Sequence, residues 1–145
     1  MIENIGKKIK RIAIVGGILG AFYASQIGFN NLFHNKEYIN GNYHSVTKTD
    51  GAFSHTGFTR YHNGDYREDT LDQHCFLGSS RTMTDGGIDG ENDGLVDSIH
   101  IRGPRFGGVT GVLTREENYK GFKYEFDDAD RFLAETKERF AEYFK

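Results

Sequence analysis

The sequence predicts an α+β fold: a small antiparallel β-sheet with an amphipathic C-terminal helix packed on it, preceded by an N-terminal hydrophobic helix. Three observations predict this fold. A basic flank leads into an apolar stretch, short alternating runs between Gly-rich turns fill the middle, and an apolar stripe at helical spacing ends the chain. We expect residues 1–29 to form a signal or anchor helix, residues 30–42 a tether, and residues 43–145 a single domain.

The composition indicates a folded domain with an acidic surface. Aromatic residues make up 14% and charged residues 27% of the 145 residues, which is enough apolar mass for a small core. Cys75 is the single cysteine, so it has no partner for an internal disulfide, and we expect a small buried side chain there. Residues 1–29 carry four basic and one acidic residue, which leaves 14 basic and 20 acidic residues, or −6, for the remainder. This negative charge favours cations over polyanions as binding partners and gives no sign of nucleic-acid binding.

The N-terminal segment has the pattern of a secretory signal or an uncleaved membrane anchor. Four basic residues precede an apolar stretch over residues 12–29; they are Lys7, Lys8, Lys10 and Arg11. The uninterrupted apolar part, residues 12–24, is shorter than the roughly 20 residues that span a bilayer. Cleavage after residue 24 or 25 would place Phe22 or Tyr23 where small residues are preferred. We therefore expect a retained membrane anchor with the domain outside the cytoplasm, and secretion after cleavage as the alternative.

Two other interpretations of this segment have less support. Gly16, Gly17 and Gly20 give G-G-x-x-G, whereas a dinucleotide-binding turn needs G-x-G-x-x-G and a later strand ending in an acidic residue. A buried helix of a soluble fold does not account for the basic flank. Gly16 and Gly20 also have the G-x-x-x-G spacing that allows helices to approach closely, so a homo-oligomer or an envelope assembly subunit stays open.

The middle of the chain predicts several antiparallel strands. Asn63-Gly64 is a type I′ turn signal, which would place Tyr61 opposite Tyr66. The same register places Arg60 opposite Arg67, which is unfavourable unless an acidic neighbour intervenes. Residues 81–84 and 95–101 show the alternation of two further strands, and residues 108–114 and 120–126 that of another pair.

The end of the chain predicts a helix over residues 127–145. Asp127 is a suitable N-cap, and Asp128 and Asp130 suit the positive end of the helix dipole. The apolar stripe that should face the sheet consists of Phe132, Leu133, Thr136, Phe140, Tyr143 and Phe144.

The loop over residues 85–97 is rich in carboxylates and glycine and has no basic residue. Counted from Asp89, oxygen side chains fall at positions 1, 3, 5 and 9, with Gly at position 6, which permits a sharp turn. Calcium prefers six to eight oxygen ligands, and a cation would relieve the repulsion between these carboxylates. We expect Val96, the apolar residue at position 8, to hold the loop on the core.

This stretch resembles the D-x-D-x-D-G calcium-binding loop of EF-hands and the related calcium-binding β-hairpin loops of FG-GAP repeats. The resemblance covers about nine residues. It implies calcium as the cofactor, bound by the side chains of Asp89, Glu91 and Asp93, by the carbonyl of Leu95, and by Asp97 directly or through water.

Three departures from the EF-hand pattern favour a hairpin loop with a structural ion. Position 3 is Glu91, which is longer than the usual Asp, position 12 is His100 where an EF-hand has a bidentate Glu, and the flanks are strands. We expect weak binding, near ~10⁻⁴–10⁻³ M. Asp85 would add a ligand if the D-G-G-I segment folds back. The alternative is a solvated turn without an ion.

An enzyme is the competing interpretation. Of the six histidines, His44, His55, His62 and His74 lie on predicted strands or turns, and with Asp65, Asp69 or Asp72 they could form a His/Asp metal-dependent hydrolase. We prefer surface histidines, because no two histidines are four residues apart on a predicted helix and no H-E-x-x-H occurs. The serines lack a G-x-S-x-G elbow, so an enzyme is the less favoured interpretation. The sequence indicates no substrate and no particular protein partner.

Overall fold

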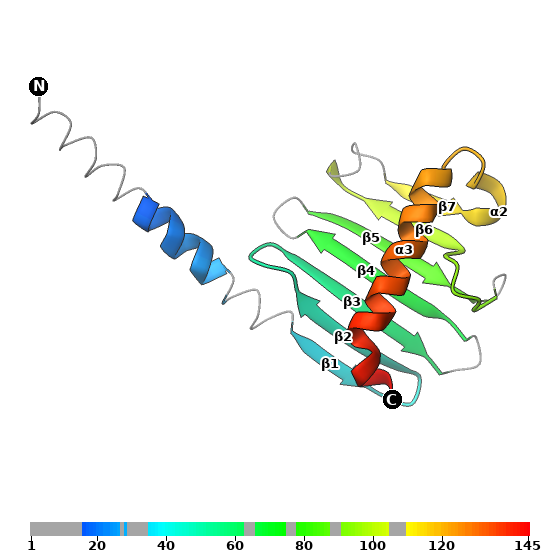
Figure 1. Cartoon of the computed structure of the whole chain (residues 1–145), viewed down its shortest axis with the longest axis horizontal. Coiled ribbons are helices and arrows are strands. Elements are labelled where there is room, and N and C mark those ends of the chain that lie inside the picture. Colours follow the sequence, from blue (N-terminus) through cyan, green and yellow to red (C-terminus); the bar gives the residue numbers. More distant parts are fainter. Residues whose placement is uncertain are drawn as a thin grey trace, which may run out of the picture.

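The computed structural model describes residues 16–26, 28, 35–62, 66–74, 78–87, 91–104 and 110–145. Figure 1 shows a β-sheet crossed by a C-terminal helix, with a second helix, residues 16–26, extending away from the domain. The strands are β1 (Lys36–Ile39), β2 (Tyr43–Thr49), β3 (Ser54–Tyr61), β4 (Glu68–His74), β5 (Ser79–Asp85), β6 (Ser98–Arg102) and β7 (Gly111–Thr114). The helices after them are α2 (Arg115–Asn118), α3 (Lys123–Phe140) and the 3₁₀ turn η2 (Ala141–Phe144).

The sheet is a meander in which every strand pairs antiparallel with its neighbour in the sequence, in the order β1 to β7. Directly opposite residues of an antiparallel pair point to the same face, so one row of the register gives the core face. That row runs through Val46, Phe58, Thr70, Met83 and Ile99, all of which are buried. The predicted antiparallel α+β architecture is confirmed.

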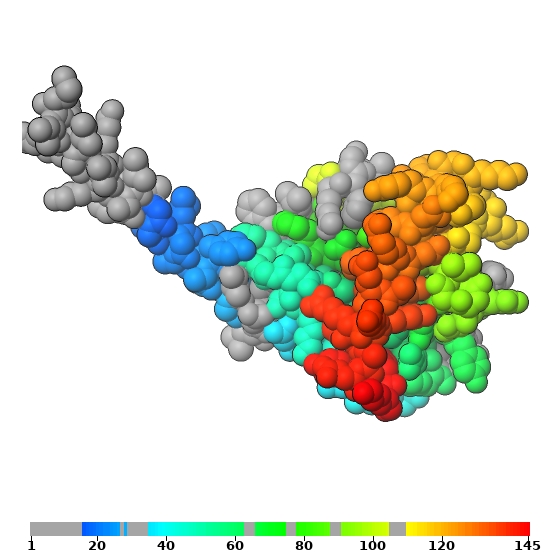
Figure 2. Space-filling model, in the orientation of Figure 1, coloured from blue at the N-terminus to red at the C-terminus, as the bar shows by residue number. Residues whose placement is uncertain are grey.

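Helix α3 covers this core face. Its buried residues recur at three- and four-residue steps, which is the spacing of one helix face. Figure 2 shows α3 and η2 lying across the sheet. The buried residues of α3 are Phe126, Ala129, Leu133, Thr136 and Phe140.

The helix begins earlier than the sequence predicts. It starts at Lys123 with Phe122 as N-cap, so the predicted strand over residues 120–126 and the predicted cap at Asp127 are both wrong. Phe126 belongs to the same apolar stripe as Ala129 and Leu133. Because Phe126 is buried in the core as part of this stripe, the helix begins before it. Lys123 and Asp127, four residues apart, form an ion pair on the first turn.

The β3–β4 hairpin differs from the predicted register by one residue. Arg60 lies opposite Glu68, and the Tyr61 amide donates to the Arg67 carbonyl at 2.9 Å. The predicted pairing of Arg60 with Arg67 is therefore wrong. The observed register relieves the charge repulsion of that pairing by placing a carboxylate opposite the guanidinium. The turn residues 63–65 and Cys75 lie outside the described residues.

The range predicted as a tether contains the edge strand β1, which pairs with β2. Before it, the helix at residues 16–26 contacts the domain through Tyr23 and Phe53, whose ring centroids are 6.2 Å apart. In the described part of the chain, no helix has both the length and the apolar character needed to cross a bilayer.

Candidate functional site

A row of charged residues crosses the core face beside the hydrophobic row, at the end of the sheet where β3 ends and β4 begins. The register places His44 opposite Arg60, Arg60 opposite Glu68, and Glu68 opposite Asp85. Glu68 is 5% exposed and Asp85 is fully buried. Burying a carboxylate is costly unless it is paired with a cation or hydrogen-bonded. The partners of Glu68 and Asp85 therefore decide whether this end of the sheet is stable.

Lys137 of α3 lies over both carboxylates. Its ammonium is 2.5 Å from Glu68 Oε2 and 3.0 Å from Asp85 Oδ2. The second Glu68 oxygen, Oε1, accepts a hydrogen bond from Arg60 Nε at 2.8 Å. Two cations and two anions thus form a compact cluster, here called the buried charge cluster: Arg60, Glu68, Asp85 and Lys137.

The cluster shifts the pKa values of Asp85 and Lys137 for different physical reasons. Burial raises the pKa of Asp85, and the hydrogen bond and charge of Lys137 only partly oppose that rise, because the charge of nearby Glu68 adds to it. Burial alone would lower the pKa of Lys137, but its hydrogen bonds to Glu68 and Asp85 and their charges raise it. Lys137 has two anionic neighbours, whereas Asp85 shares its single cation with Glu68. The cluster therefore holds the lysine charged more firmly than it holds the Asp85 carboxylate ionised.

One oxygen of Asp85 has no hydrogen-bond partner among the residues that the structure describes. Oδ2 accepts from Lys137 and from the Gly94 amide, at 3.0 and 3.1 Å, but no described group donates to the buried Oδ1. A buried acceptor without a donor costs roughly 1–3 kcal/mol. Such an atom marks a place where a proton, a water molecule or a cation would be bound favourably.

The acidic loop closes on itself through backbone amides. Asp93 Oδ1 accepts from the Leu95 amide at 2.9 Å, and Asp97 Oδ2 accepts from the Gly86 amide at 2.8 Å. Together with the Gly94–Asp85 bond, these contacts place Asp85 at the base of the loop. The loop is joined to the sheet by its own carboxylates.

The predicted calcium ligands that the structure describes lie on the surface part of the loop. Glu91, Asp93 and Leu95 are exposed, Asp97 is half-buried, and Asp89 lies outside the described residues. Among the residues that the structure describes, no three His, Cys, Asp or Glu side chains are grouped so that they could hold a metal ion. The carboxylate that the fold buries at the base of the loop is Asp85, which the sequence indicated only as an additional ligand.

The predicted anchor of the loop is confirmed. Val96 is fully buried in the core, and its amide donates to Asp130 Oδ1 of α3 at 2.8 Å. Arg115 Nε donates to the Val96 carbonyl at 2.7 Å, and its guanidinium is 2.5 Å from Asp130. The C-terminal part of the loop is thus fixed to both α2 and α3.

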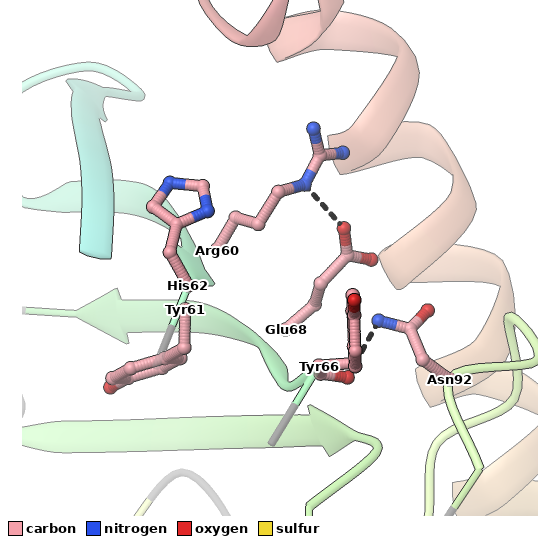
Figure 3. Close-up of a pocket in the computed structure, with 6 residues that line it drawn as sticks. All are labelled: Arg60, Tyr61, His62, Tyr66, Glu68 and Asn92. Atoms are coloured by element: carbon pink, nitrogen blue, oxygen red, sulfur yellow. Dashed lines mark hydrogen bonds and ion pairs between the residues drawn. The ribbon is translucent and has the colours of Figure 1, made fainter. Parts of the chain in front are cut away.

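A cavity of about 360 Å³ opens beside the buried charge cluster, between the β3–β4 turn and the acidic loop. Figure 3 shows the Arg60–Glu68 pair on one side of it and the Asn92 amide pointing at the backbone of Tyr66 on the other. Asn92 Nδ2 donates to the Tyr66 carbonyl at 2.9 Å. Tyr66 has a φ of 38°, which is unusual for a residue other than glycine, and its side chain is exposed. The lining residues are Arg60, Tyr61, His62, Tyr66, Glu68 and Asn92.

The described histidines are dispersed. His44 bonds Glu37 at 2.9 Å and contacts the Phe144 ring, whereas His62 lines the cavity. His55 is buried on β3, and His74 ends β4. No described histidine therefore joins a group of metal-ligating side chains.

Comparison of the chain with protein-family models, with curated proteins and with solved structures finds no match. The site therefore has to be interpreted from its own residues.

Proposed function

We propose that the chain is a small membrane-anchored or exported domain whose β5–β6 loop binds one calcium ion that stabilises the end of the sheet. The observation that carries the proposal is the fully buried Asp85 at the base of this loop, with an oxygen that no described group satisfies. The neighbouring Glu91, Asp93 and Asp97 supply only oxygen donors, which suits a hard dication.

Calcium binding would require the exposed carboxylates of the loop to move toward Asp85. One oxygen each of Asp85, Asp93 and Asp97 accepts a backbone amide, so a cation would take the other oxygens. Glu91, Asp93 and Gly94 are exposed and lie between two fixed points, Asp85 and the buried Val96. The ion would join these two points, and its role would be structural.

We expect calcium to raise the stability of the full-length chain. With a Kd of about 10⁻⁴–10⁻³ M, 10 mM calcium would add roughly 1.4–2.7 kcal/mol to the free energy of unfolding. Thermal unfolding in chelator, in calcium and in magnesium measures this effect. Glu91→Gln with Asp93→Asn should abolish the rise, and Glu135→Gln with Glu138→Gln, which removes the same charge from exposed positions of α3, should preserve it. Equal midpoints in chelator and calcium would mean a solvated turn.

The membrane part of the proposal rests on the N-terminal helix. Its described residues expose large apolar side chains, and Figure 1 shows the helix extending away from the domain. A helix that exposes such side chains needs lipid or another protein surface to cover them. The basic flank before it favours an anionic membrane surface on that side. The exposed apolar residues are Ile18, Leu19, Phe22 and Tyr23.

We expect the full-length chain to stay in the membrane fraction after an alkaline wash and to be released by detergent. Ile18→Asp with Leu19→Asp should shift it to the soluble fraction, because each Asp costs about 2.5–3.5 kcal/mol in a helix at the bilayer centre. Ala134→Asp with Ala141→Asp adds the same charge at exposed positions of the C-terminal helix and should leave the distribution unchanged. Soluble oligomers of the unmodified chain would instead indicate that the helix packs against other copies.

A further inference from the structure

The face of the sheet opposite α3 carries a continuous row of polar side chains. In the register, one residue of each strand lies in this row, and every one of them carries a hydroxyl or a carboxylate. Among the described residues, α3 and η2 pack on the other face. The members of this row, here called the polar row, are Tyr38, Ser45, Thr59, Asp69, Thr84, Ser98 and Thr114.

Three tyrosine rings, one of them from the polar row itself, lie together at one end of that row. The ring centroids of Tyr38 and Tyr43 are 5.5 Å apart, and those of Tyr43 and Tyr61 are 5.8 Å apart. Tyr38 is 56% exposed, on the edge strand. The three rings lie on the same face of the neighbouring strands β1, β2 and β3. They form an aromatic surface that runs perpendicular to the strands.

An ion pair continues the line of tyrosines onto β4. Arg67 donates to both oxygens of Asp69, at 2.8 and 2.7 Å, and its guanidinium lies 5.2 Å from the centre of the Tyr61 ring. Asp69 also accepts from the Tyr61 hydroxyl at 3.2 Å and from Thr84 Oγ1 at 2.8 Å. This network fixes Tyr61, and the Asp69 carboxylate offsets the charge of Arg67, so the pair has no net charge to attract an anion.

A hollow of about 710 Å³ lies beyond this network. Arg67, Thr84, Asp97, Ser98 and Thr114 are among its lining residues, so three members of the polar row reach it. The tyrosines, the network and the hollow form one continuous track across the strands. Such a track suits an extended ligand better than a compact one.

We propose that this face binds a neutral oligosaccharide chain. Sugar rings present C–H faces that stack on aromatic rings and hydroxyls that both donate and accept hydrogen bonds, which the tyrosines and the polar row match. Aromatic platforms also bind single-stranded nucleic acid, but they then lie in a positively charged groove. Here the arginine is paired and the chain after residue 29 carries a formal charge of −6, so a polyanion is disfavoured.

The proposal is tested by electrophoresis of the full-length chain through native gels that contain hydroxyethyl cellulose, glucomannan or soluble starch, with heparin and poly(dT) gels beside them. We expect at least one neutral polysaccharide to retard the protein. Tyr43→Ala should weaken that binding about tenfold, which corresponds to the ~1.4 kcal/mol of one lost stacking contact. Tyr38→Ala at the sheet edge and Thr59→Val, which keeps the branched shape, repeat the test with less effect on folding.

The matched control is Tyr124→Ala, because Tyr124 is 77% exposed on α3, away from this face, and its loss should leave the retardation unchanged. Absence of retardation in every neutral gel would overturn the proposal, and so would retardation that all three face variants preserve. Retardation by heparin or poly(dT) alone would assign the face to a polyanion. A dimer that Tyr43→Ala dissociates, without retardation, would assign it to a second copy of the chain.

Discussion

Lys137→Met should lower the free energy of unfolding by about 3 kcal/mol. The substitution keeps an unbranched side chain one atom shorter than lysine but removes the ammonium that lies 2.5 Å from Glu68 and 3.0 Å from Asp85. Removal of one partner from a buried ion pair typically costs about 3–5 kcal/mol, because the remaining charge is left without compensation. We place Lys137 at the low end because its side chain is 29% exposed. Urea unfolding measures the change as a lower midpoint with an unchanged slope.

Two further variants separate the loss of the charge from the loss of packing. Lys123→Met removes a lysine of α3 whose ion pair with Asp127 is exposed, and it should leave the urea midpoint nearly unchanged. Lys137→Met combined with Asp85→Asn and Glu68→Gln removes the anions together with the cation and should recover part of the lost stability. If Lys137→Met and Lys123→Met shift the midpoint equally, the cluster does not stabilise the fold.

The cluster could not have been predicted from the sequence. Lys137 and Asp85 are separated by 52 positions, and the hairpin signal at Asn63-Gly64 placed Arg67 rather than Glu68 opposite Arg60. A shift of one residue in a strand register moves its side chains to the other face. The correct register depends on tertiary contacts of β4 with α3, which local turn preference does not contain.

The parts that were predicted correctly have a strong local signal. The alternation in the segment after Leu95 predicts β6, and the stripe through Leu133 and Phe140 predicts the C-terminal helix. The start of that helix was missed because residues 120–126 alternate like a strand while Phe126 also fits the helix stripe. Burial of Phe126 in the core shared with the sheet favours the helical spacing over the strand alternation. Burial is a property of the folded chain, so the local sequence does not contain it.

The acidic loop shows the same division between local and non-local information. Its composition and the position of Val96 are local, and the structure confirms that Val96 is buried. The isolation of Asp85 Oδ1 depends on how α3, the Gly94 amide and β4 surround it. The sequence therefore predicts a cation site in this loop, and the fold adds that Asp85 at its base has an oxygen that no described group satisfies.

Gly86→Ala should destabilise the domain by roughly 3 kcal/mol or more. Gly86 has a φ of +88°, and a Cβ added there would lie 2.4 Å from the carbonyl oxygen of Tyr66. Backbone strain at such a residue costs about 1–3 kcal/mol, and the contact with main-chain atoms adds to it. Relief would require the backbone at Tyr66 and Arg67 to move away, which would disturb the hydrogen bond from Asn92 to the Tyr66 carbonyl.

Gly87→Ala is the matched control, because Gly87 also has a positive φ, +108°, but no described atom lies within 4 Å of the added Cβ. It should cost only the backbone strain, about 1–2 kcal/mol. The difference between the two variants, read from their urea midpoints, therefore measures how tightly the backbone at Tyr66 and Arg67 packs on the base of the acidic loop. Equal losses would show that this backbone moves away without cost. A larger loss for Gly86→Ala would mean that the cavity lined by Tyr66 and Asn92 has a wall fixed by backbone contact, so that a ligand bound there would meet a preformed surface.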